Sequence, residues 1–171
     1  PTGLFQIDHL RTPSDFLLLA QRTLIRCQLL VQRIARAIGN PSELARVVRN
    51  LDRLSDMLCG VIDMAELVRH AHPDQGWANA ANDAYEYLCN YMNVLNTHTE
   101  LYDALRCVME TKDIYHSLSQ EAQAVAHIFM RDFEKSGIHL PPHERNRFVE
   151  LSDQIMILGR AFLQDMSTGT S

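Results

Sequence analysis

Cysteine is scarce in this sequence, and long apolar runs are missing altogether. The four cysteines are spread over eighty positions, with no C-x-x-C pair and no dense framework: Cys27, Cys59, Cys89 and Cys107. Such spacing is typical of reduced thiols that pack as small hydrophobic residues, although two long-range disulfides are also compatible with it. No apolar run approaches the roughly 18 residues that a membrane-spanning helix requires, so the sequence predicts no membrane span.

Positive charge is also in short supply, because 16 lysines and arginines face 21 aspartates and glutamates. The net charge of −5 does not favour a general nucleic-acid-binding protein, although a local basic face is compatible with it. Hydrophobic residues make up 46% and charged residues 22% of the 171 positions, which is ordinary for a folded domain and argues against disorder. The first residue is proline rather than methionine, which is compatible with an absent targeting segment.

Glycine and proline are few, and they interrupt long stretches in which apolar residues recur every three or four positions. A threonine N-cap followed by Pro13 predicts the start of a first helix, and its apolar pattern ends at Gly39. An asparagine N-cap followed by Pro41 repeats the signal. The second pattern stops before Pro73, because the residue that precedes a proline is disfavoured in a helix. The tight connection predicts an antiparallel pair of amphipathic helices.

The same periodicity predicts a third and a fourth helix. The third runs from Trp77 to Met109, with a kink or a division at Asn96-Thr97. The fourth starts at a capping box formed by Ser117 and Gln120. It ends at Gly137, which suits a left-handed C-terminal cap, and the isoleucine that follows can supply the hydrophobic contact of such a cap.

A fifth helix opens at Pro141-Pro142 and carries one apolar face, made of Phe148, Leu151, Ile155, Leu158 and Phe162. Since no alternating strand pattern of useful length occurs, we predict an all-α fold of about five long amphipathic helices in an antiparallel, bundle-like array. A long coiled coil is the alternative, and the breaks at glycine and proline argue against it. An apolar face that the bundle leaves over is expected to dock on another domain. The expected boundaries are an extended segment at 1–11, a helical region at 12–166 and a polar tail at 167–171.

One segment begins like a zinc-binding motif. His143-Glu144 opens a stretch similar to H-E-x-x-H, but Arg147 stands where the second histidine would have to lie. A guanidinium is permanently charged and does not bind zinc. We therefore interpret the segment as a polar first helical turn, with Glu144 near the positive end of the helix dipole.

The other candidate residues for chemistry favour structural roles. His70 and His72, with Asp74 close by, flank the predicted end of the second helix, where helix termination is favoured over a metal site. His98 lies in an apolar stripe and is expected to be a hydrogen-bonded core or kink histidine. The sequence has no G-x-S-x-G elbow and no glycine-rich phosphate loop, and Cys27 is expected to be a buried thiol. We therefore assign no catalytic, cofactor-binding or metal-binding residue within this chain.

The first helix carries a basic stripe with almost no acid opposing it, made of Arg22, Arg26, Arg33 and Arg36. Such a stripe is suited to an acidic peptide, an RNA backbone or anionic lipid. The favoured interpretation is a solvated face, or one paired with the acids available on the second helix, namely Asp52, Asp56, Asp63 and Glu66.

Three segments carry a resemblance to a known family. They are Gly3-Leu4-Phe5, the stretch from Leu54 to Pro73 that ends in Ala-His-Pro, and the stretch from Phe129 to Leu140, which contains the block Asp-Phe-Glu-Lys-Ser-Gly-Ile. Together they resemble the amino-terminal region of the mitochondrial intermediate peptidases, a branch of the thimet-oligopeptidase-like zinc metallopeptidases. The block is typical of the wider family, and the other two segments point to the mitochondrial branch. The resemblance covers residues 3 to 163.

The resemblance implies a zinc endopeptidase of the mitochondrial matrix, which removes a short amino-terminal peptide, usually an octapeptide, from imported precursor proteins. It also implies a helical ellipsoid split by a deep channel, with zinc held by H-E-x-x-H and a further glutamate. None of those ligands can be carried over onto this numbering. The chain is therefore expected to be a non-catalytic part of the channel wall, with the carboxy-terminal catalytic portion as its partner. A free-standing helical interaction or scaffold module is the competing hypothesis.

Overall fold

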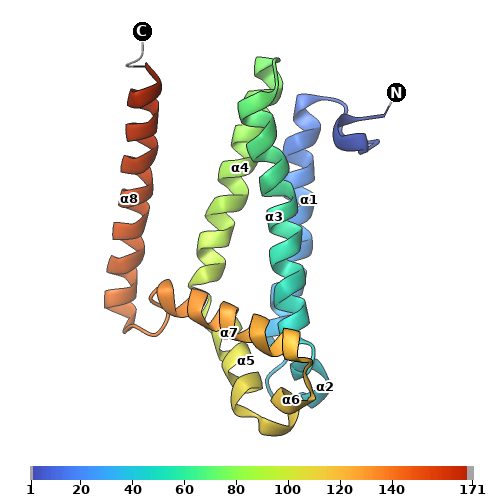
Figure 1. Cartoon of the computed structure of the whole chain (residues 1–171), viewed down its shortest axis with the longest axis vertical. Coiled ribbons are helices and arrows are strands. Elements are labelled where there is room, and N and C mark those ends of the chain that lie inside the picture. The colour runs from blue at the N-terminus through green and yellow to red at the C-terminus, as the bar shows by residue number, and fades with distance from the viewer. Residues whose placement is uncertain (1, 169–171) are drawn as a thin grey trace.

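The computed structural model describes residues 2–168, and these form eight α-helices and one short 3-10 helix, which confirms the all-α prediction. Three long helices make the central bundle: α1 (Pro13–Ala35), α3 (Val47–Ala71) and α4 (Gln75–Asn96). Each of them packs against the other two, and short connections make successive helices antiparallel (Figure 1). No helix within residues 2–168 is both long and apolar enough to span a membrane.

The hydrophobic core lies where α1, α3 and α4 meet, and it continues into Leu101, Ala104, Leu105 and Val108, which are also buried. Its residues recur every three or four positions along each helix, which is why the periodicity of the sequence predicts them. The members with essentially no exposed surface include Phe16, Ala20, Cys27, Ile34, Val47, Leu58, Ala65, Ala81, Ala84 and Leu88. Burial of this apolar surface is the main term that holds the three helices together.

The second predicted helix is divided into two. The Asn40 side chain caps α2 (Pro41–Leu44) as expected, because its oxygen accepts hydrogen bonds from the backbone amides of Ser42 and Glu43. The helix lasts only one turn. After it the hydrogen bonds span three residues rather than four, because the Arg46 amide donates to the Glu43 carbonyl. A new helix, α3, then starts at Val47.

Three shorter helices form one end of the molecule: α5 (Thr99–Glu110), α6 (Lys112–Ser117) and α7 (Gln120–Lys135). The division between α4 and α5 confirms the break predicted at Asn96-Thr97. The capping box of Ser117 and Gln120 was a wrong prediction, because Ser119 is the N-cap of α7 and its hydroxyl accepts from the Ala122 amide at 3.2 Å. The Ser117 hydroxyl instead donates to the Ile114 carbonyl.

One glycine ends a helix in the predicted way. Gly137 directly follows the C-cap of α7 and has φ of +75°, in the left-handed region that favours glycine. Ile138 is buried beside this cap. The first helix is shorter than its apolar pattern predicted, because α1 ends at Ala35 and Gly39, with φ of +88°, lies in the turn that follows.

The last helix, α8 (Pro142–Thr168), stands apart from the three-helix bundle (Figure 1). It therefore does not close the predicted five-helix array, although it is helical over the predicted range. Of the expected polar tail, positions 167 and 168 belong to α8, and 169–171 lie outside the described residues. At the other end, residues 2–11 contain a 3-10 turn at Leu4–Gln6 rather than a fully extended segment.

Candidate functional site

The segment that resembles a zinc motif forms the exposed first turn of α8. The side chains of His143 and Glu144 are both largely exposed, and their closest nitrogen and oxygen atoms are 3.7 Å apart. Arg145 donates from its guanidinium to the Leu140 carbonyl at 3.1 Å, which ties the start of α8 to the preceding turn. Within the described part of the chain, no three histidine, cysteine or carboxylate side chains are arranged to hold a metal ion. The residues of this segment therefore do not provide the ligand set for the zinc ion that the resemblance implies.

The histidines at the end of α3 confirm helix termination. The last helical residue is Ala71, and His72 is extended. The ring of His72 accepts a hydrogen bond at Nδ1 from the amide of Asp74, which in turn caps α4 through the amide of Gly76. Two residues earlier, the Nε2 atom of His70 lies 3.3 Å from Oε1 of Glu66, one turn back along α3. The contacts of His72 and Asp74 thus connect the end of α3 to the start of α4.

Two further residues occupy structural positions. His98 sits at the N-cap position of α5, directly at the break between α4 and α5, as a kink histidine would. Its Nδ1 atom is buried and has no hydrogen-bond partner among the described residues. Cys27 is fully buried, and the loss of solvent raises the pKa of its thiol to about 11. No two of the four cysteines, all of which lie within residues 2–168, form a disulfide bond.

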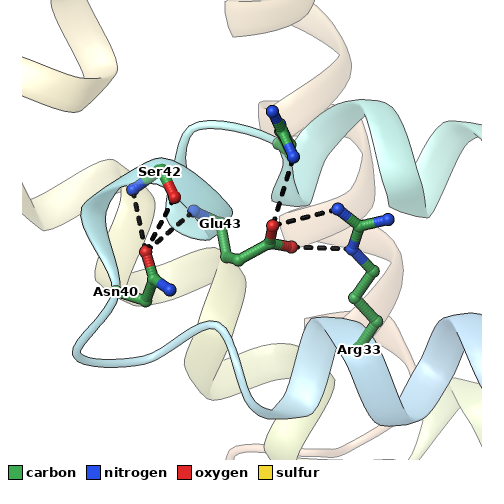
Figure 2. Close-up of polar contacts among 5 residues, drawn as sticks. Arg33, Asn40, Ser42 and Glu43 are labelled. Carbon is green, nitrogen blue, oxygen red and sulfur yellow. Dashed lines mark hydrogen bonds and ion pairs between the residues drawn. The ribbon is translucent and has the colours of Figure 1, made fainter.

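The basic stripe of α1 makes one salt bridge, at the junction with α2. Arg33 holds Glu43 with two hydrogen bonds, from Nε to Oε2 at 2.7 Å and from Nη2 to Oε1 at 2.9 Å (Figure 2). Arg46 approaches the same carboxylate at 3.2 Å. The hydrogen bond from Arg33, with its charge, lowers the pKa of Glu43, and the Glu43 carboxylate raises the pKa of Arg33. Asn40 caps the same turn, so the cluster fixes α2 against the end of α1.

The solvated alternative is confirmed for Arg22, Arg26 and Arg36, which are exposed and have no ion pair within residues 2–168, whereas Arg33 pairs with an acid other than the four expected. No ion pair within residues 2–168 joins the arginines of α1 to Asp52, Asp56 or Asp63, and Glu66 is engaged by Arg69 at 2.7 Å. The three aspartates lie on the exposed face of α3. An acid on α3 that reached α1 would have to lie near the buried side, which apolar residues occupy.

A cleft of about 400 Å³ opens where α7 crosses the bundle, and we call it the α3–α7 cleft. Its floor is apolar, with leucines of α3 and α4 and two phenylalanines of α7. Its edge is polar, with a carboxylate, an ammonium and a hydroxyl close together on α7: Asp132, Lys135 and Ser136. No sequence pattern predicted this cleft, because its lining residues have the same periodicity as core residues. A volume of this size is sufficient for a small ligand or for side chains of a peptide.

The predicted apolar face of α8 is present and uncovered. We call it the α8 face, and it is formed by Phe148, Leu151, Ile155, Leu158 and Phe162. The exposed fraction rises to 69% at Ile155 and Leu158. A contiguous apolar strip of this kind usually marks an interaction surface in a stable protein.

Comparison with known proteins gives one consistent result. The chain is 64% identical to the mitochondrial intermediate peptidase of Mycosarcoma maydis, over 97% of this chain and 20% of that protein. It is 59% identical to the mitochondrial intermediate peptidase of Coprinopsis cinerea, over 98% of this chain and 22% of the relative. Mitochondrial intermediate peptidase 2 of Cryptococcus neoformans is 48% identical over 99% of this chain. No protein-family model and no solved structure matches the chain. It thus spans about a fifth of the length of these curated relatives, and the resemblance seen in the sequence is confirmed.

Proposed function

From similarity to mitochondrial intermediate peptidases over nearly the whole chain, we propose that the chain is the amino-terminal, non-catalytic helical portion of a peptidase of this type. The complete enzyme would be a zinc endopeptidase of the mitochondrial matrix. Its substrates would be imported precursor proteins, from which it removes a short amino-terminal peptide. The observation that carries the proposal is the 64% identity over 97% of the chain.

The zinc and its ligands are assigned to the part of the enzyme outside this chain. Support comes from the donor chemistry, since Arg147 replaces the second histidine of the zinc motif and His143 is exposed to solvent. In this proposal the helical portion contributes to the wall of a channel. Such a wall acts by positioning an unfolded chain and keeping folded proteins away from the metal.

The α8 face would pack against the catalytic portion of the same enzyme. Five large apolar side chains along one helix face are costly to leave in water, at roughly 25 cal/mol for each Å². The described helices do not cover them, whereas the relatives are about five times longer than this chain. The remaining polypeptide is therefore the partner that the proposal requires.

Mixing the chain with the separately produced remainder of the enzyme tests this packing. The two should co-elute in size-exclusion chromatography, and the combination of Ile155→Gln and Leu158→Gln should abolish co-elution. Leu67→Gln with Ile128→Gln is the matched control, because these residues are 57% and 56% exposed on other helices. Co-elution that survives the α8 substitutions, or is lost equally in the control, would contradict the assignment of this face.

A free-standing interaction module is the second candidate, and the closed core of α1, α3 and α4 favours it. Such a core can fold by itself, independent of other polypeptide. If the isolated chain is monomeric, melts cooperatively and shows no affinity for the remainder of the enzyme, this second candidate is supported. Stabilisation by the remainder would support the peptidase portion instead.

A further inference from the structure

The outward side of α1 carries large aliphatic residues at the points farthest from the core. The buried positions of this helix are Phe16, Ala20, Thr23, Cys27, Val31 and Ile34. At about 3.6 residues per turn, Leu18, Ile25 and Leu29 project on the opposite side. Their exposed fractions are 42%, 57% and 63%. An ordinary solvated helix has polar or charged residues at such positions, so this side of α1 is not explained by packing within the bundle.

Arginines run along one flank of these aliphatic residues. At the same helical period, Arg22, Arg26 and Arg33 lie to one side, and Arg36 follows at the end of the helix. No aspartate or glutamate occurs between Asp15 and Glu43. We call the three aliphatic residues and the four arginines together the α1 ridge.

The positive charge of the α1 ridge is largely uncompensated. Of its four arginines, only Arg33 has an ion pair within residues 2–168, and its partner Glu43 is shared with Arg46. The exposed acids of α3 do not lie next to the α1 ridge, because α3 packs against the opposite, buried side of α1. A chain with a net charge of −5 therefore presents one helix side that is basic and apolar at once.

We propose that the α1 ridge is a docking surface for an anionic phospholipid membrane. Leu18, Ile25 and Leu29 enter the boundary between headgroups and acyl chains, and the arginines bind lipid phosphate oxygens. This arrangement of apolar centre and cationic flank is that of helices which lie in a membrane interface. The attraction of such arginines to anionic lipid is electrostatic and falls off within a Debye length.

The shape of the α1 ridge favours lipid over a protein partner. The ridge is the convex side of one continuous helix, and Leu18 and Leu29 are separated by roughly 16 Å along its axis. A folded partner would need a complementary groove of that length, whereas a fluid lipid surface adapts to a convex ridge. The proposal goes beyond peptidase function and does not depend on it.

Vesicle co-sedimentation of the full-length protein tests the proposal. Vesicles of equal parts phosphatidylcholine and phosphatidylglycerol should bind the protein, pure phosphatidylcholine should not, and added salt should weaken the binding. The triple variant Arg22→Gln, Arg26→Gln and Arg36→Gln should bind about two orders of magnitude more weakly, because each basic residue near the surface contributes about one power of ten or slightly less. The variant Leu18→Gln, Ile25→Gln and Leu29→Gln should also lose binding, by about tenfold or more.

Two control variants keep the test specific. Arg49→Gln, Arg53→Gln and Arg131→Gln remove the same charge from exposed positions elsewhere. Leu67→Gln, Val94→Gln and Ile128→Gln remove comparably exposed apolar side chains. Both controls should bind as the wild type does, and circular dichroism checks that every variant is folded.

Three outcomes would overturn the proposal. The first is failure of the wild-type protein to bind the anionic vesicles at low salt. The second is binding that persists in both α1-ridge variants, which would place the membrane contact elsewhere. The third is binding of an acidic amphipathic peptide at the ridge without any binding of vesicles, which would assign the surface to a protein partner. Loss of vesicle binding in both ridge variants, but in neither control, supports the proposal.

Discussion

At the scale of single residues, Cys27 shows how burial alone decides reactivity. The thiol lies on the inner side of α1, where it has no exposed surface, and burial raises its pKa to about 11. The thiolate is the reactive form of cysteine, so both access and ionisation protect this residue. The other three cysteines are only partly buried.

We therefore expect Cys27 to be the last cysteine that iodoacetamide modifies in the folded protein. Mass spectrometry of alkylated peptides over a time course measures the four rates separately. All four should react at similar rates in denaturant, which serves as the control. Modification of Cys27 as fast as Cys59 or Cys107 under native conditions would show that the first helix is not packed as described.

The salt bridge between Arg33 and Glu43 predicts a pH dependence of stability. The pKa of Glu43 in the folded chain is below the ordinary 4.5, mainly because Arg33 donates hydrogen bonds to its carboxylate. Since the folded pKa is lower than the unfolded one, the stabilisation is complete above the unfolded pKa and disappears as the pH falls through the folded pKa. The urea midpoint of the wild type should thus fall more steeply on acidification below pH 4.5 than that of Glu43→Gln.

Glu100→Gln provides a control for this measurement, since Glu100 is exposed and has no ion pair within residues 2–168. It should retain the acid sensitivity of the wild type. Equal acid sensitivity of Glu43→Gln and the wild type would mean that the pair does not act in solution.

At the scale of the helices, two glycines with opposite environments give a matched pair of substitutions. Gly137 ends α7 with φ of +75°, and an added Cβ would lie 3.1 Å from side-chain atoms of Leu140 and Phe148. Gly60 lies inside α3 with no atom within 4 Å of an added Cβ. Gly137→Ala should destabilise the chain by about 1–2 kcal/mol, whereas Gly60→Ala should stabilise it by about 0.5–1 kcal/mol.

Urea unfolding followed by circular dichroism measures both changes against the wild type. Opposite signs for the two variants are the expected result. A neutral or stabilising effect of Gly137→Ala would show that the chain does not adopt the left-handed cap there.

The sequence predicted helix starts better than it predicted interruptions. Pro13, Pro41 and Pro142 each begin a helix, because proline fits the first turn without loss of a hydrogen bond. The short helix α6 was missed, since it lies between the end of the third apolar pattern at Met109 and the predicted start of the fourth helix at Ser117. Thr111 marks the break between α5 and α6, where its hydroxyl donates to the Cys107 carbonyl and its backbone is extended.

The contact partners of a helix face were predicted less well than the face itself. The periodicity of α8 predicts an apolar side that runs through Leu151, Ile155 and Leu158, and the structure has it. The periodicity of one helix does not identify the segment that packs against its apolar side. Likewise, the sequence offered four acids of the second helix as partners if the basic stripe was paired, but the acid that Arg33 binds is Glu43. The tight turn between α1 and α2 decides this pairing, and the sequence pattern does not encode its geometry.

At the scale of the whole molecule, a closed three-helix core is combined with surfaces that the core does not use. The core of α1, α3 and α4 is extended by buried residues of α5 and α7, and its burial is the main term that stabilises the fold. The α8 face and the α3–α7 cleft are apolar and open, and the α1 ridge is basic and apolar. The relatives are about five times longer than this chain, so a division between a structural core and docking surfaces is expected for a portion of a larger enzyme.

We propose that this chain is a necessary but non-catalytic portion of a zinc peptidase. Peptidase activity on a precursor-type peptide, measured for the full-length protein, this chain, the separate remainder and the mixture of both, tests it most directly. We predict activity that a zinc chelator abolishes in the full-length protein and in the mixture, and none in this chain alone. Chelator-sensitive cleavage by the purified chain alone, or full activity of the remainder without it, would contradict the claim.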